Sequence, residues 1–74
     1  MEDLEYIEPN LDGTWSMYEK SGAKTRAPPD TLIGMYGAKN LSRLIEKSYE
    51  RGYISQQQAN SMIAHILMMQ IIKN

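Results

Sequence analysis

The chain contains no cysteine and only one histidine, His65. Without cysteine there can be no disulfide bond and no thiolate ligand for a metal, and a single histidine cannot supply a zinc site. The absence of cysteine also fits a reducing compartment. The sequence therefore predicts a cytoplasmic protein that uses no metal and no cofactor.

Long hydrophobic runs are missing as well. The longest apolar stretch, residues 62–72, is interrupted by His65 and Gln70, whereas a helix that spans a membrane needs about 20 apolar residues. The first residues, Met-Glu-Asp-Leu-Glu, are acidic and lack the apolar segment of a signal peptide. We therefore expect no contact with a membrane.

The 74 residues leave little room for an active site. A chain of this length forms one small domain, and so few residues seldom enclose a pocket of enzyme size. The acids Asp30, Glu46 and Glu50 have no partner at a spacing typical of general acid–base catalysis. We expect no catalytic residue, no small-molecule substrate and no enzyme activity.

Basic residues are absent from positions 1–19, which carry six acids, so the net charge of −1 hides an acidic N-terminal segment and a basic remainder. Such a segment either contacts a partner or keeps an apolar protein soluble. Its side chains Tyr6, Ile7 and Trp15 are predicted to bind a partner, because large aromatic groups make good anchors. We favour a flexible arm that orders on binding; the alternative is a short β-hairpin turned at residues 9–13.

Residues 20–29 show no hydrophobic periodicity and end in Pro-Pro, which is typical of a linker. The predicted organisation is therefore an acidic, aromatic arm (residues 1–19), a linker (residues 20–29) and a helical hairpin domain (residues 30–74).

A first helix is indicated by apolar residues that recur at helical spacing from Leu41 to Tyr49. Gly52 would end it, because glycine readily adopts the left-handed backbone of a helix C-terminus. Its start is open. Asp30 is a good N-cap, whereas Gly37 is unfavourable inside a helix, so the helix begins either at residue 30 or just after Gly37.

A second helix has a clear N-terminal signal. Ser55 and Gln58 form a capping box, in which each side chain bonds the backbone amide of the other residue. This helix runs to about Lys73. The predicted fold class is therefore small and all-α: an antiparallel helical hairpin with an N-terminal arm. The stretch from Leu44 to Leu67 resembles the short C-terminal helical hairpins found at the ends of many bacterial proteins, which implies the same hairpin and no function.

The second helix is too apolar for a two-helix protein. Between residues 62 and 72 only His65 and Gln70 are polar, so apolar side chains surround most of the helix. One neighbouring helix covers a single stripe, and the rest would face the folded-back arm, a second copy or another protein. The partner-binding residues predicted here are Leu67, Met68, Ile71 and Ile72.

Four basic residues follow one another at strict four-residue spacing on the first helix, which places them along one side of it. They either face solvent or bind an anionic partner such as nucleic-acid phosphate. This basic stripe consists of Lys39, Arg43, Lys47 and Arg51.

These features together predict a non-enzymatic protein-interaction module, such as an adaptor, chaperone or regulator. It would bind a larger protein or form a dimer through its C-terminal helix. The alternative is a small transcription regulator, of the kind that phages encode, which binds RNA polymerase or nucleic acid through the basic stripe. Nucleic acid is the less favoured partner, because binders of nucleic acid usually carry a net basic domain and this chain totals −1.

Overall fold

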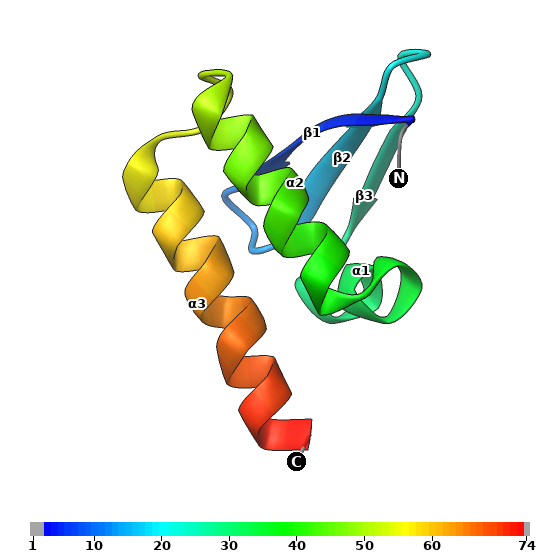
Figure 1. The fold of residues 1–74 in the computed structure, drawn as a ribbon. Coiled ribbons are helices and arrows are strands. Elements are labelled where there is room, and N and C mark those ends of the chain that lie inside the picture. Colours follow the sequence, from blue (N-terminus) through cyan, green and yellow to red (C-terminus); the bar gives the residue numbers. More distant parts are fainter. Residues whose placement is uncertain (1–2, 74) are drawn as a thin grey trace.

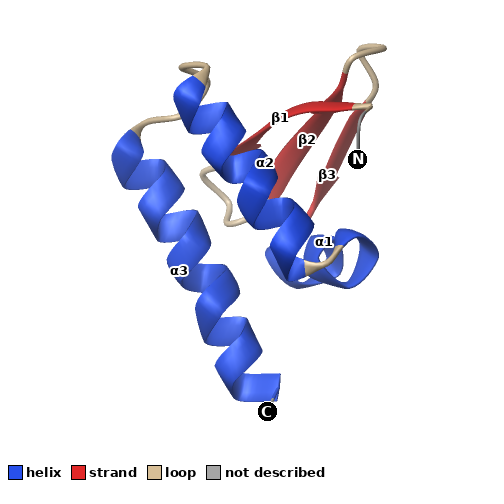
Figure 2. Cartoon of the chain, viewed as in Figure 1, coloured by secondary structure: helices blue, strands red, loops and turns tan. Residues whose placement is uncertain are grey.

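The computed structural model describes the backbone of residues 3–73 and the side chains of residues 3–71. Three strands are followed by three helices along the chain (Figure 1). The elements are β1 (Leu4–Pro9), β2 (Trp15–Glu19), β3 (Lys24–Ala27), α1 (Pro29–Tyr36), α2 (Ala38–Glu50) and α3 (Gln56–Lys73). The strands form one antiparallel sheet in the order β1-β2-β3, and α2 lies across one face of it (Figure 2).

The prediction of an all-α protein was wrong, because the chain has a mixed α/β fold. β1 and β2 lie in the range expected for the arm, and β3 lies in the range expected for the linker. The sequence Lys-Thr-Arg-Ala of β3 shows no apolar pattern, yet it pairs with β2 through its backbone. A hairpin alone is marginal in water, but a third strand and a helix packed on one face make it stable.

The two faces of the sheet differ in character, because successive side chains of a strand point to opposite sides. Ile7 of β1 lies opposite Met17 of β2, and both are buried against the helices. Tyr6 lies opposite Tyr18 on the other face, where both side chains are partly exposed. The apolar and aromatic residues of β1 and β2 therefore divide between the core and the outer face of the sheet.

A buried hydrogen bond joins the sheet to α2. The hydroxyl of Ser48 accepts the backbone N–H of Ile7 at 2.9 Å and donates to the backbone carbonyl of Leu44 at 2.8 Å. Ser48 is fully buried, so this side chain satisfies an amide that water cannot reach. The contact fixes α2 against β1 in one orientation.

A glycine separates the first two helices. Gly37 has φ 89°, a conformation that favours glycine, and α2 begins just after it at Ala38, which agrees with one of the two starts predicted for the first helix. The prediction of Asp30 as N-cap was wrong: α1 begins at Pro29, and Asp30 lies in the first turn. Proline suits that first position, because its missing N–H would have no partner there. The predicted end of α2 is confirmed, since Gly52 follows it with φ 84°.

The capping box at the start of α3 is confirmed. The N–H of Ser55 donates to Gln58 Oε1 at 2.8 Å, and the N–H of Gln58 donates to Ser55 Oγ at 3.0 Å. α2 and α3 run antiparallel side by side, as expected (Figure 1). The helical hairpin therefore exists, but as one part of a core that it shares with the sheet.

Candidate partner-binding surface

α3 carries apolar side chains on two opposite sides. The side that faces the rest of the protein is buried, with Ala59, Met62 and Ile66 at 5%, 2% and 1% exposure. The opposite side carries exposed apolar residues at spacings of three and four, which place them in one line along the helix. We call this line the outer stripe; it consists of Ala64, Leu67, Met68 and Ile71.

The outer stripe is open to solvent along its length. Leu67, Met68 and Ile71 are 58%, 61% and 73% exposed. α3 lies at the edge of the molecule, and no other helix or strand of the described residues lies on its side away from α2 (Figure 1). Aligned large apolar groups of this kind mark interaction surfaces on soluble proteins. The side chain of Ile72, the fourth predicted contact on this helix, lies outside the described residues.

The predicted contacts of the N-terminal segment lie elsewhere in the fold. Ile7 and Trp15 are 0% and 5% exposed and belong to the hydrophobic core. Their strands form part of the sheet instead of folding over α3, so the outer stripe stays uncovered. The structure therefore brings together the candidate residues of α3 and separates them from those of the N-terminal segment.

Tyr6 takes part in an aromatic stack on the outer face of the sheet. Its ring lies between those of Tyr53, 3.9 Å away, and Tyr18, 4.4 Å away, with interplanar angles of 3° and 12°. Lys24 Nζ lies 5.4 Å from the centre of the Tyr18 ring. Burial raises the pKa of Tyr6, as do the neighbouring Tyr18 and Glu8. Both faces of the Tyr6 ring are thus occupied, and the stack joins the α2–α3 loop to the sheet.

All four members of the basic stripe are exposed. Arg51 donates to the backbone carbonyl of Glu5 at 3.2 Å. Among residues 3–71 the ion pair between Asp and Arg or Lys side chains is that of Asp12 with Arg26, and the only other close contact of a carboxylate with a basic nitrogen is Asp30 with His65, so the stripe forms no ion pair there. The structure therefore presents one apolar surface on α3 and one basic surface on α2.

Sequence reasoning missed a groove of about 430 Å³ between the β1–β2 turn and the first half of α3. Trp15, Met62 and His65 line it, together with the polar side chains of Asn10, Gln57, Gln58 and Ser61. The His65 ring meets Trp15 edge-on at 5.7 Å, and its Nε2 lies 3.5 Å from Asp30 Oδ1. The polar spacing of Gln58, Ser61 and His65 was visible in the sequence, but the contact with a tryptophan 50 positions earlier was not.

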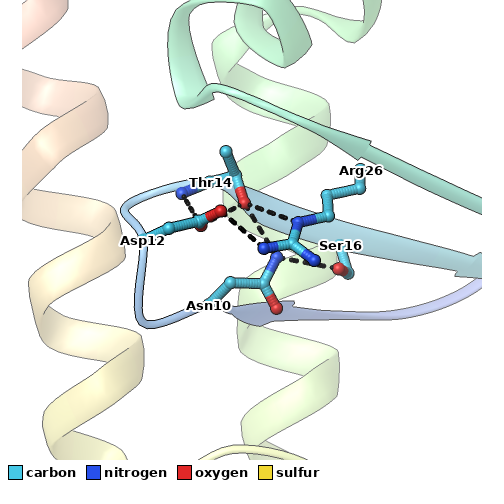
Figure 3. A network of polar contacts seen from close by, with 5 residues as sticks. All are labelled: Asn10, Asp12, Thr14, Ser16 and Arg26. Atoms are coloured by element: carbon cyan, nitrogen blue, oxygen red, sulfur yellow. Dashed lines mark hydrogen bonds and ion pairs between the residues drawn. The ribbon is translucent and has the colours of Figure 1, made fainter.

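A polar network holds the β1–β2 turn beside β3 (Figure 3). The carboxylate of Asp12 accepts the N–H and the hydroxyl of Thr14, at 3.0 and 2.6 Å, and pairs with Arg26. These hydrogen bonds, those of Thr14 foremost, lower the pKa of Asp12 to about 2. Asn10 donates to the hydroxyls of Thr14 and Ser16 at 3.0 and 2.9 Å. The network fixes the turn in place.

Comparison with protein-family models, curated proteins and solved structures finds no match. None of the helices among the described residues combines the length and the hydrophobicity that a membrane span requires. Among the same residues, no three histidine, aspartate or glutamate side chains come close enough together to hold a metal ion. The exposed surfaces of α2 and α3 are therefore the features that bear on function.

Proposed function

We propose that this protein is a non-enzymatic interaction module that binds another protein through the outer stripe of α3. One observation carries the proposal: three large apolar side chains, 58–73% exposed, stand in line on a helix whose other side is anchored in the core. An anchored helix presents its side chains with little loss of conformational freedom on binding. This is the helix-in-groove type of recognition, in which residues at helical spacing enter an apolar groove of the partner.

The composition of α3 supports the same proposal. Residues 56–71 contain no lysine, arginine, aspartate or glutamate. Small soluble domains usually intersperse charges over their exposed surface, whereas the centres of interfaces are depleted of charge and enriched in methionine. The outer stripe resembles an interface centre more than ordinary surface.

Capture of partners from an extract of the natural source tests the proposal. The variant Leu67→Glu/Met68→Glu places two charges on the outer stripe and should lose the captured protein. Met35→Glu is the matched control, because Met35 of α1 is exposed to a similar degree, 59% against 61% for Met68. Both variants should keep the helical circular dichroism of the parent. If the double variant captured the partner as well as the parent does, the outer stripe would not be the binding surface.

A second candidate function is a small transcription regulator that binds RNA polymerase or nucleic acid through the basic stripe. The observation in its favour is that all four basic side chains are exposed, three along α2 and Arg51 at its C-cap, and make no ion pair within residues 3–71. Retention on heparin or DNA that falls steeply with salt would support it, because phosphate binding releases counterions. Arg43→Gln/Lys47→Gln should then weaken retention, while Leu67→Glu/Met68→Glu should not.

A further inference from the structure

We infer that the outer stripe of α3 binds a second copy of this chain, through an antiparallel pair of α3 helices related by a two-fold axis. The inference rests on the proposed function, because it names the partner of the same surface. Spacing, charge and position in the fold each support a second copy as the occupant.

The spacing of the outer stripe allows two copies to pair. Positions 64, 67, 68 and 71 are symmetric about the midpoint between Leu67 and Met68. A two-fold axis through that midpoint places Leu67 opposite Met68 of the second copy and Ala64 opposite Ile71 of the second copy. In such an interface the same patch serves both subunits. A small residue facing a large one lets the helix axes approach to about 8–10 Å.

Charge favours a copy of the chain over a charged partner. Because residues 56–71 carry no acidic or basic side chain, two outer stripes can meet without repulsion between like charges. His65, the only titratable group in that range, contacts Trp15 and Asp30 on the groove side and is not part of the outer stripe. The basic stripe of α2 could not associate with itself in this way.

The position of α3 leaves room for a second molecule. α3 forms one edge of the protein, and its buried side is already occupied by α2 and the core (Figure 1). Pairing through the outer stripe would extend the α2–α3 hairpin into a row of four helices, ordered α2, α3, α3 and α2. The sheets would lie clear of the contact, so neither subunit would have to change its fold.

The expected dimer is weak. The outer stripe spans two turns of α3, and its four side chains cover less than the roughly 800 Å² per partner of a standard stable interface. We therefore expect a dissociation constant on the order of 10 μM, and a dimer that separates on dilution.

Sedimentation equilibrium tests the dimer. Protein concentrations from about 1 μM to about 1 mM span the expected dissociation constant. The mass should rise with concentration from the 8.5 kDa of one chain towards twice that value. Met68→Glu should stay monomeric throughout with an unchanged helical signal, whereas Met35→Glu should dimerise like the parent. A parent that remains monomeric at the highest concentration, or a Met68→Glu variant that dimerises, would overturn the inference.

Cross-linking through introduced cysteines tests the antiparallel arrangement. The chain has no cysteine of its own, so only the introduced residues can form a disulfide bond. A mixture of Ala64→Cys and Ile71→Cys chains should give the mixed cross-linked dimer several-fold faster than either variant alone. Two parallel helices would instead bring identical positions together. Faster cross-linking of each variant with itself would therefore contradict the antiparallel pair.

The outcomes also separate this inference from the proposed function. A monomeric parent that still captures a different protein, and loses it on Leu67→Glu/Met68→Glu, overturns the dimer and leaves the interaction module standing. A parent that neither dimerises nor captures a protein overturns both.

Discussion

The two sides of α3 have nearly the same composition and opposite surroundings. Met62 and Met68 show this best: they lie six residues apart on one helix, and their side chains are 2% and 61% exposed. The inner side is explained by the fold, because it completes the core formed with the sheet and α2. The outer stripe has no such explanation within one chain. Hydrophobicity alone therefore does not decide which residues of α3 stabilise the fold. Their position in the packed structure decides whether they join the core or stay exposed, where a partner could reach them.

The largest expected effect is the difference between the two methionines when each is truncated. Met62→Ala should lower the free energy of unfolding by about 3 kcal/mol, because it leaves a cavity in the core. Met68→Ala should change it by less than about 0.5 kcal/mol, since an exposed side chain loses little. Urea unfolding at a concentration where the parent is monomeric measures both. Equal losses in the free energy of unfolding for the two variants would contradict the burial of Met62 and the exposure of Met68.

A second variant tests how α2 is held to the sheet. Ser48→Ala should cost about 2 kcal/mol, because the buried N–H of Ile7 loses its acceptor. Ser42→Ala, also on α2 but only half-buried, is the matched control and should have little effect. Unfolding in urea measures both variants, and a loss at Ser42 as large as that at Ser48 would rule out the buried hydrogen bond as the cause.

A third variant concerns the end of α3 that both sides share. Ser55→Ala should cost about 1 kcal/mol, because the N–H of Gln58 would lose its capping acceptor. Ser61→Ala lies in the interior of the same helix on an exposed side and should be neutral or slightly stabilising. Thermal melts of the two variants decide the matter. An unchanged midpoint for Ser55→Ala would show that the capping box adds nothing to stability.

The smallest expected effect lies outside α3, in the β1–β2 turn. The pKa of Asp12 is about 2 in the folded protein against an ordinary value of 3.8. The ionised carboxylate therefore stabilises the folded state fully above about pH 4. This stabilisation is lost as the pH falls towards 2, where the carboxylate of the folded protein becomes protonated. Between about pH 4 and pH 2 the Asp12→Asn variant should lose less stability than the parent. Unfolding of both proteins at each pH measures this difference. An identical pH profile in the variant would place the acid sensitivity elsewhere.

Local signals in the sequence predicted the helical hairpin correctly. The capping box at Ser55 and the terminating Gly52 each depend on residues close together in the chain, and both are confirmed. The excess of apolar residues on α3 was also apparent, because it needs only helical periodicity. The exposure of Leu67, Met68 and Ile71 agrees with that excess, while their binding of a partner stays a prediction.

The sheet could not be predicted in the same way, because it depends on contacts between distant residues. A β-hairpin was the less favoured of the two predictions for residues 1–19, because an isolated hairpin is marginal in water. Two distant elements stabilise the hairpin: α2, through the hydrogen bond from the N–H of Ile7 to Ser48, 41 residues later, and the α2–α3 loop, through the stack of Tyr6 on Tyr53. The sequence predicts a linker where β3 lies, because pairing through the backbone leaves no trace in a polar sequence such as Lys24–Ala27.

NMR of the methyl groups of two methionines can show whether the outer stripe is a contact surface. In methionine-methyl-labelled protein, a soluble paramagnetic probe should broaden the signals of Met35 and Met68 equally at low concentration, because both are exposed. Raising the protein concentration, or adding extract of the natural source, should protect Met68 and leave Met35 broadened. If Met68 stays as accessible as Met35 under every condition, the outer stripe binds nothing and the account is contradicted.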